Sequence, residues 1–438
     1  MLDIEKHILD KLLPWCDRSS FCIAFSGGMD STVLLHAVAH LAKQYRFPQL
    51  RAIYIEHGLQ EVAQTWPAHC QRICAELQVP LTVISVDVAP TASVERAARE
   101  ARYAAFAEHL HSDEVLLMAQ HLDDQAETVL FRLLRGAGVS GLRGIPEQRA
   151  LNLGYLLRPL LGLSRQQLQN YAQQRGLQWI EDPSNASDGF ARNYLRQHII
   201  PRLQTRWPAL RSTLQRSAQH MQEAQQLLDE LAELDLKHAQ PQASLAWLQL
   251  PSLDLNAVRE LSLARQKNLL RYWLAAFTLP PDSAHWQRWQ TLRDAKSAAS
   301  PLWRLQQGAL LRSHNTVYWL PQDYLDEPPA LRLTIACAGR YQLARNGFLI
   351  VSGELHAPLQ IRYRQGAERL LIAGRGHRDV KRLLQEEGIP AFVRGRLPLV
   401  FQQDELVAIA NLTHLNRPSL SKVTIAWQLV DEHQFASK

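Results

Sequence analysis

The first half of the chain alternates short apolar runs with amphipathic stretches of helical period. The apolar runs, which predict buried strands, lie at residues 21–25, 50–55, 81–86 and 114–119. The stretches that predict helices begin at residue 32 and continue at 61–77, 93–110 and 123–134. Repeated strand–helix units of this length are typical of a parallel sheet with helices on both faces. We therefore predict an α/β fold with a parallel, doubly wound sheet for this half.

The second half shows a different pattern. A helical stretch with few glycines runs from Pro208 to about residue 238, and proline suits a first helical position. Residues 255–320 are rich in Trp, Leu and Arg, and we expect them to be mostly helical. Prolines then mark a linker, and short β-rich runs at 348–353, 359–363 and 406–410 predict a small α+β domain. We accordingly divide the chain into domains at residues 1–208, 209–325 and 330–438.

Polar clusters follow three of the predicted strands. They lie at residues 26–31, 56–58 and 121–124, each directly after an apolar run. Because ligands bind at the carboxyl ends of parallel strands, these clusters are expected to meet at one edge of the sheet. The sequence therefore predicts a single active site in the first half of the chain.

The first cluster reads Ser-Gly-Gly-Met-Asp-Ser and has the features of a phosphate-binding loop. Two glycines let the backbone approach an anion, and the following helix N-terminus supplies free N–H groups and a positive dipole end. The hydroxyls of Ser26 and Ser31 can donate hydrogen bonds to the anion, while Asp30 is a candidate magnesium ligand or helix cap. The Walker lysine is missing, so this is not a P-loop. Taken alone, the motif also fits an ordinary strand–turn–helix bend.

The third cluster places three carboxylates within five residues at a helix start. Asp123 and Glu127 are spaced to share a helix face, whereas Asp124 is expected to point elsewhere. Acids in a first helical turn are commonly only dipole partners. Beside a phosphate loop, we favour binding of magnesium or of a polarised substrate group. His57, in the second cluster, is a candidate phosphate donor or acid–base group, and a structural role in the turn is its alternative.

Two segments are candidates for contact with a polyanion. Arg192 and Arg196 lie one helical turn apart with Asn193 between them, which suits phosphate or base contacts. Residues 361–400 hold nine Lys or Arg against four Asp or Glu, so most of the chain's net charge of +6 lies there. This stretch is typical of an RNA-binding surface, although a solvated charged face is the alternative for both segments.

Composition excludes several classes of protein. The chain has 438 residues, 46% hydrophobic and 21% charged, as in globular proteins. It contains no apolar run of transmembrane length and no signal peptide, so we expect a cytoplasmic location and no membrane partner. No two of the five cysteines form a Cys-x-x-Cys pair, which favours buried thiols over a disulfide or metal site.

Together these motifs resemble the N-type ATP pyrophosphatases, PP-loop enzymes that cleave ATP between the α and β phosphates and transfer AMP. A more specific similarity, to the tRNA(Ile)-lysidine synthase family, is carried by residues 56–59, 119–128, 181–185, Arg192–Asn193 and the basic stretch 374–394. It covers nearly the whole chain, with the middle segment the least recognisable. Tyr54 stands where many relatives carry a histidine, so no paired-histidine role is expected.

The resemblance implies ATP-dependent ligation of L-lysine to C2 of the wobble cytidine, position 34, in the CAU anticodon of tRNA(Ile). The reaction passes through an adenylated cytidine, yields lysidine, AMP and pyrophosphate, and changes decoding from AUG to AUA. The resemblance leaves open the general base, the lysine-binding residues and the discrimination against tRNA(Met). It also leaves open the oligomeric state, a homodimer included.

On this basis we hypothesise roles for individual residues, with ATP and Mg²⁺ as cofactors. ATP is expected to contact Ser26, Gly27, Gly28, Met29, Asp30 and Ser31. The expected catalytic residues are Asp30, His57, Asp123 and Asp124, and the three aspartates of this set are the expected Mg²⁺ ligands. The residues expected to bind tRNA are Arg192, Asn193, Arg196, Arg375, Arg378, Lys381 and Arg394.

Two other functions fit parts of this pattern. A tRNA thiolase of the same superfamily generally needs paired cysteines, and Cys70 and Cys74, four residues apart, are a poor substitute. A non-catalytic RNA-binding module with a relic nucleotide fold is the other alternative. The intact loop, with Asp30, Asp123 and Asp124 all retained, argues against it.

Overall fold

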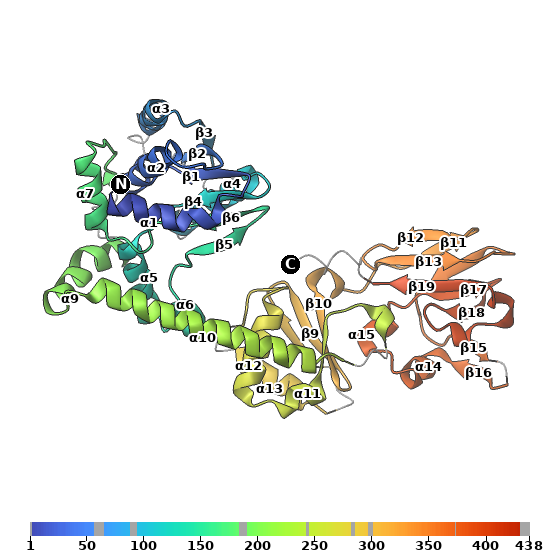
Figure 1. Ribbon diagram of the computed structural model, residues 1–438. Coiled ribbons are helices and arrows are strands. Elements are labelled where there is room, and N and C mark those ends of the chain that lie inside the picture. The colour runs from blue at the N-terminus through green and yellow to red at the C-terminus, as the bar shows by residue number, and fades with distance from the viewer. Residues whose placement is uncertain are drawn as a thin grey trace. The chain divides into compact units, whose positions relative to one another are not determined.

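The computed structural model describes residues 2–56, 65–87, 94–183, 191–241, 245–281, 285–296, 301–372 and 374–429. His57, from the polar cluster at 56–58, and residues 184 and 185 of the motif at 181–185 lie outside these ranges. The chain divides into two compact units, Met1–Gln226 and Leu227–Lys438, referred to below as the first and second units. Figure 1 shows their elements in colours that follow the chain.

The first unit is built on a six-stranded sheet with the order β3-β2-β1-β4-β6-β5. Its strands are β1 (Ser20–Ala24), β2 (Gln49–Glu56), β3 (Leu81–Ser85), β4 (Glu114–Leu117), β5 (Gln148–Leu151) and β6 (Gly154–Leu157). All neighbours pair in parallel except β5, which runs antiparallel to β6 at one edge. The predicted parallel α/β fold is confirmed, with one antiparallel edge strand in addition.

Helices cover both faces of this sheet. The helices of this part of the chain are α1 (Asp3–Leu12), α2 (Met29–Ala42), α3 (Trp66–Leu77), α4 (Val94–His109), α5 (Leu122–Leu134), α6 (Val139–Leu142), α7 (Arg165–Gln174), α8 (Ala191–Tyr194), α9 (Ile200–Arg206) and α10 (Leu210–His238), with a 3-10 turn at Leu13–Trp15 and a π-helical turn at Leu195–Ile199. Phe21 and Ile23 of β1 pack with α1, α2, α3 and α7. Cys22, between them, packs in a separate core with Phe106 of α4. This alternation is what a doubly wound sheet requires.

The middle of the chain combines helices with strands. The expected helices are present as α11 (Leu255–Glu260), α12 (Leu263–Leu274) and α13 (Trp286–Asp294). The expectation of a mostly helical segment up to residue 320 is wrong for its last third. There, β8 (Leu302–Leu305), β9 (Gly308–Ser313) and β10 (Thr316–Pro321) form an antiparallel sheet with β7 (Ser252–Asp254). Trp303, Leu310 and Val317, one from each of β8, β9 and β10, lie in the same core. Burial of these side chains on one face of the sheet therefore favours strands over helix in this segment.

The C-terminal part of the second unit has the expected α+β character. Its strands are β11 (Arg332–Ile335), β12 (Gly339–Gln342), β13 (Phe348–Ser352), β14 (Leu359–Arg362), β15 (Arg369–Ile372), β16 (Gly376–Asp379), β17 (Leu399–Gln402), β18 (Glu405–Ile409) and β19 (Thr424–Gln428), and its helices are α14 (Val380–Glu386) and α15 (Ala391–Arg394). Short 3-10 turns lie at Ala246–Leu248, Gln322–Tyr324, Thr413–Leu415 and Pro418–Leu420. The strands form sheets β11-β14-β17-β18, β12-β13-β19 and β15-β16. No helix in the described ranges is long and apolar enough to cross a membrane.

A buried ion pair fixes the amino ends of the three central strands of the first unit. Glu114 at the start of β4 is 0% exposed and accepts hydrogen bonds from Arg51 Nε (2.8 Å) and Ser20 Oγ (2.8 Å). Burial raises the pKa of Glu114, but hydrogen bonds from Arg51, the His111 N–H and Ser20 lower it by more, so the carboxyl stays ionised. The pair therefore joins β1, β2 and β4 at the end opposite their carboxyl termini.

We expect Glu114→Ala to destabilise the first unit by about 3–5 kcal/mol, because it leaves the Arg51 charge buried and unpaired. Native-state hydrogen exchange of amides in β1, β2 and β4 of the full chain measures this loss. Glu76→Ala is the control, since it removes an exposed ion pair with Arg72 and is expected to cost less than about 1 kcal/mol. Equal small losses in both variants would contradict the prediction.

Candidate active site

The Ser26–Ser31 loop joins the end of β1 to the start of α2. Gly28 is the N-cap of α2, so no side chain occupies the free N–H groups of the first helical turn. Ser31 Oγ donates to Gly28 O (3.0 Å) and accepts from the Ser26 N–H (3.3 Å). Ser31 is buried and holds the loop together, and the hydroxyl of the exposed Ser26 lies at hydrogen-bond distance from Ser31 Oγ (3.1 Å) at the surface of the loop. The loop therefore offers an anion one hydroxyl and a row of backbone N–H groups.

Gly27 is the position of this loop where only glycine fits. Its φ is +78°, in the left-handed region. A Cβ at Gly27 would lie 2.9 Å from Ile180 Cδ1 and 3.0 Å from Cys70 Sγ. Gly27 O also accepts a hydrogen bond from the Ile180 N–H at 2.8 Å. The loop is thus held against α3 and the segment that follows α7.

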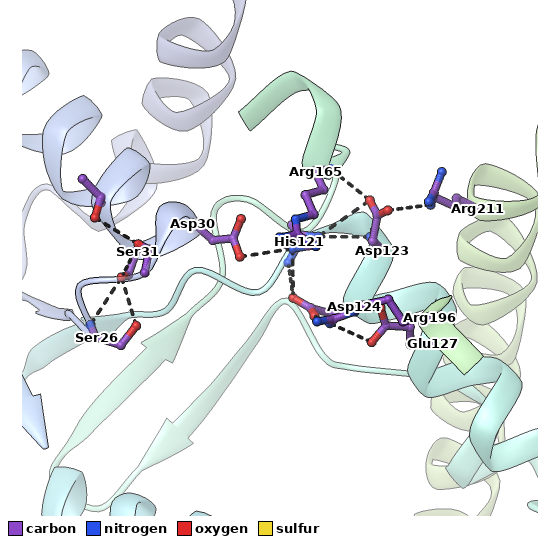
Figure 2. A network of polar contacts seen from close by, with 12 residues as sticks. Ser26, Asp30, Ser31, His121, Asp123, Asp124, Glu127, Arg165, Arg196 and Arg211 are labelled. Carbon is purple, nitrogen blue, oxygen red and sulfur yellow. Dashed lines mark hydrogen bonds and ion pairs between the residues drawn. The ribbon is translucent and has the colours of Figure 1, made fainter. Parts of the chain in front are cut away.

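His121 connects this loop to the acids of α5. It is 2% exposed, and its Nδ1 accepts a hydrogen bond from the Asp123 N–H at 3.2 Å. Its Nε2 lies 3.5 Å from Asp30 Oδ2 and 3.6 Å from Asp124 Oδ2. Figure 2 shows His121 between these two carboxylates. Burial lowers the pKa of His121, but the carboxylates of Asp124, Asp30 and Asp123 raise it by more. One buried histidine therefore holds together acids that follow two different strands.

The acids of α5 divide between two arginines. Asp123 Oδ1 lies 2.6 Å from Arg211 Nε, an ion pair without hydrogen-bond alignment, and its Oδ2 accepts from the Arg165 N–H at 2.9 Å. Arg196 donates to Glu127 Oε1 (2.6 Å) and Oε2 (2.9 Å) and to Asp124 Oδ1 (3.3 Å). The expectation that Asp124 points elsewhere than Glu127 is therefore wrong, because Arg196 contacts both carboxylates. Glu127 shares its arginine with Asp124, one position closer in the helix.

Most of the predicted site residues of the first unit come together at this edge. The loop, Asp30, Asp123 and Asp124 gather around His121, a residue for which the motif had suggested no role. His121 belongs to the polar cluster at 121–124 that follows β4, and its place in that cluster is the signal that could have singled it out. Glu127, Arg165 and Arg211 join the network as well, and only Glu127 belonged to the expected acidic cluster (Figure 2).

The residues expected to bind tRNA have different surroundings. Arg375, Arg378 and Lys381 are exposed in the second unit, whereas Arg394 is half-buried and donates to Ile389 O at 2.7 Å. In the first unit, the Arg192 guanidinium lies 5.9 Å from the centre of the Phe131 ring. Arg196 is engaged with Glu127 and Asp124, so its guanidinium is committed within the chain. The tRNA roles of this set, Asn193 included, stay predictions.

The acids of the site differ in how well they could bind magnesium. In the described residues no three or more His, Cys, Asp or Glu are arranged to hold a metal ion by themselves. Mg²⁺ beside a nucleotide, however, is usually held by one or two carboxylates together with phosphates and waters. Asp30 Oδ1 is buried and has no hydrogen-bond partner, a free oxygen that fits this role. Asp123 fits less well, because an arginine and a backbone N–H engage its two oxygens.

The sheet order and the loop between β1 and α2 define the first unit as a PP-loop domain. The family model described as the PP-loop domain matches residues 2–203. Models described as the TilS substrate binding domain and the TilS substrate C-terminal domain match residues 253–318 and 359–429. ATP is therefore the nucleotide that the loop serves.

Relatives extend this similarity over nearly the full length. The chain is 52% identical to a tRNA(Ile)-lysidine synthase of Pseudomonas fluorescens, over 99% of this chain and 98% of that protein. It is 49% identical to the same enzyme of Pseudomonas aeruginosa, over 97% of each, and 38% identical to that of Coxiella burnetii, over 90% and 88%. The chain belongs to the tRNA(Ile)-lysidine synthase family.

We expect Gly27→Ala to weaken ATP binding, because alanine must either adopt the left-handed conformation or reshape the loop. The conformation costs about 1–2 kcal/mol, before any displacement of Ile180 and Cys70. That cost corresponds to a loss of affinity of about 5- to 30-fold, measured by calorimetric titration of the full chain with ATP.

Gly138→Ala is the matched control for this experiment. Gly138 has a φ of −80°, and a Cβ added there would meet no atom within 4 Å, so its substitution is expected to leave ATP affinity unchanged. Unchanged affinity in Gly27→Ala would show that the loop tolerates a side chain and does not approach the nucleotide there.

Proposed function

We propose that this site ligates L-lysine to C2 of the wobble cytidine in the CAU anticodon of tRNA(Ile), at the expense of ATP. The observation that carries the proposal is the joining of the PP-loop to the α5 acids through His121. This arrangement puts a phosphate cradle and carboxylates at one edge of the sheet, and the reaction needs both. Family membership supports the choice of tRNA(Ile), and a reaction on tRNA supports a cytoplasmic location.

The first step activates the cytidine. The O2 atom of cytosine attacks the α-phosphorus of ATP, an O–P bond forms, and the bond to the β-phosphate oxygen breaks to release pyrophosphate. Negative charge grows on the departing pyrophosphate, where the N–H groups at the start of α2 and the Ser26 hydroxyl can stabilise it. The loop is fixed before ATP arrives, by Ser31 and by the contact of Gly27 with Ile180, so little reorganisation is needed.

The second step forms the C–N bond. The side-chain amine of lysine attacks C2, and AMP leaves with the oxygen that was O2. The unperturbed pKa of that amine is about 10.4, so it must lose a proton to become a nucleophile. Asp30 and Asp124 are the most exposed carboxylates of the network, with 34% and 26% of their side chains accessible. We assign the proton acceptor to this pair.

Magnesium completes the proposed site. Asp30, through its free Oδ1, would hold the ion, which would neutralise phosphate charge when bound, and Asp124 would then be the carboxylate left to accept the proton. His121 keeps the two carboxylates together, and Arg211 and Arg165 keep Asp123 oriented away from this role.

The thiolase alternative receives no support from the cysteines. Burial raises the pKa of both Cys70 and Cys74 to about 12, so neither thiol ionises readily near neutral pH. A sulfur-transfer nucleophile needs a thiolate.

The reaction is tested by incubating the full chain with ATP, Mg²⁺, labelled lysine and tRNA(Ile) that carries an unmodified CAU anticodon. We expect lysine-dependent label in the tRNA together with AMP and pyrophosphate, and no label in tRNA(Met). Binding of tRNA without ATP cleavage would identify a non-catalytic module instead.

We expect Asp30→Asn to raise the Mg²⁺ concentration needed for half-maximal ligation by about tenfold or more, since loss of even a second-shell partner often costs 10–100-fold in metal affinity. Asp123→Asn is the matched control. It is expected to lower the rate but to leave the Mg²⁺ midpoint unchanged, because its oxygens contact Arg211 and Arg165. If Asp123→Asn raised the Mg²⁺ midpoint and Asp30→Asn did not, Asp123 rather than Asp30 would be the metal ligand.

A further inference from the structure

Three arginines surround Tyr103 in the first unit. The guanidinium carbons of Arg99 and Arg149 lie 5.0 and 5.1 Å from the centre of the Tyr103 ring. Arg158 Nη2 donates to the Tyr103 hydroxyl at 3.2 Å, and Arg99 Nη2 lies 3.5 Å from the same oxygen. These side chains come from α4, from the edge strand β5 and from the residue that follows β6. We refer to Arg99, Arg149 and Arg158 as the Tyr103 cluster.

The positive charge of this cluster is not neutralised within the described parts of the chain. None of the three guanidinium groups forms an ion pair with a described carboxylate. Arg158 is 3% exposed, and its hydrogen bonds reach neutral groups: Gln120 Oε1, Pro146 O and the Tyr103 hydroxyl. Burial, together with the charges of Arg149 and Arg99, lowers the pKa of Arg158. Like charges held this close repel one another, and an external anion would relieve that repulsion.

The cluster lies at the same edge of the sheet as the candidate active site. Arg158 follows β6 and Gln120 follows β4, and these strands are parallel neighbours. Gln120, which accepts from Arg158 Nε at 2.7 Å, is also the residue before His121. Tyr103, however, belongs to α4, which packs on the sheet face opposite α2 and the PP-loop. The cluster therefore lies at the same sheet edge as His121, but its helix packs on the sheet face opposite the ATP cradle.

Further arginines extend the positive charge beyond the cluster. Burial, followed by the charges of Arg192, Arg143 and Arg99, lowers the pKa of Arg132 on α5. Arg132 Nη1 donates to Gly141 O and Gly144 O, both at 2.8 Å, which are again neutral acceptors. A row of cations of this kind suits a ligand with several regularly spaced negative charges better than a single phosphate.

We propose that the Tyr103 cluster binds backbone phosphates of the polynucleotide substrate beside the nucleotide that reacts. Arg99 and Arg149, both exposed, make the contacts, while the buried Arg158 positions Tyr103 between them. The inference rests on the proposed function, since it names a surface that the tRNA of that reaction would use. ATP also carries phosphates, but the loop that binds them precedes α2. The experiment therefore distinguishes binding of tRNA phosphates from binding of ATP phosphates.

The test compares Arg99→Gln/Arg149→Gln with the wild-type full chain. Affinity for tRNA(Ile) is measured at several salt concentrations, and KM for ATP is measured at saturating tRNA. Each neutralised phosphate contributes about 0.7–0.9 to the slope of log affinity against log salt, so we expect the slope to decrease by about 1–2. At low salt the affinity should fall at least about fivefold, while KM for ATP should change by less than about twofold.

Arg46→Gln is the matched control, an exposed arginine between α2 and β2 at the amino ends of the strands. It should leave the salt slope unchanged, and thermal unfolding of all variants verifies that the fold is retained. A wild-type salt slope in the double variant would overturn the inference. So would a rise in KM for ATP with unaltered tRNA affinity, which would assign the cluster to the nucleotide. Failure of the wild-type chain to attach lysine to tRNA would refute the proposed function separately, whatever the slopes.

Discussion

The parallel pairing of β1 with β4 is the constraint on which the site depends. These strands are neighbours in the sheet although about ninety residues separate them, so their carboxyl ends deliver the PP-loop and His121 to one place. At the other ends of the same strands, the buried Glu114 of β4 accepts a hydrogen bond from Ser20 of β1. With both ends determined, Asp30 and Asp124 can meet the same imidazole nitrogen within 3.6 Å. The pairing of the strands therefore determines where the residues of the site lie, and the side-chain contacts then fix their orientation.

Charge balance is the second principle of the site. Four acids, Asp30, Asp123, Asp124 and Glu127, would repel one another at this separation in a partly buried place. Arg196, Arg211 and His121 compensate them, each from a different segment of the chain. The network can therefore persist without ATP or metal. Asp30 retains one oxygen without a partner, so it can accept a ligand without first breaking a contact.

The sequence was sufficient for the strand–helix order, the PP-loop and the acidic cluster, because each depends on local periodicity or on residues close together in the chain. The sequence did not reveal which arginines pair with the acids of the site. Arg211 and Asp123, for example, lie 88 positions apart, and no local pattern predicts their contact. The strands at 302–321 were mistaken for helix because their Trp and Leu content is equally apolar in either structure, and only sheet packing around Trp303 distinguishes them. His57 lies outside the described residues and stays a prediction.

The antiparallel strand β5 has a consequence for solubility. It closes one edge of the sheet, where unpaired N–H and C=O groups can template the addition of a strand from another molecule. β5 is only four residues long, and the exposed Arg149 places a charge on it, both of which discourage such pairing. Arg149 therefore has two effects at once: an apolar replacement would remove a cation from the Tyr103 cluster and also uncover an aggregation-prone edge.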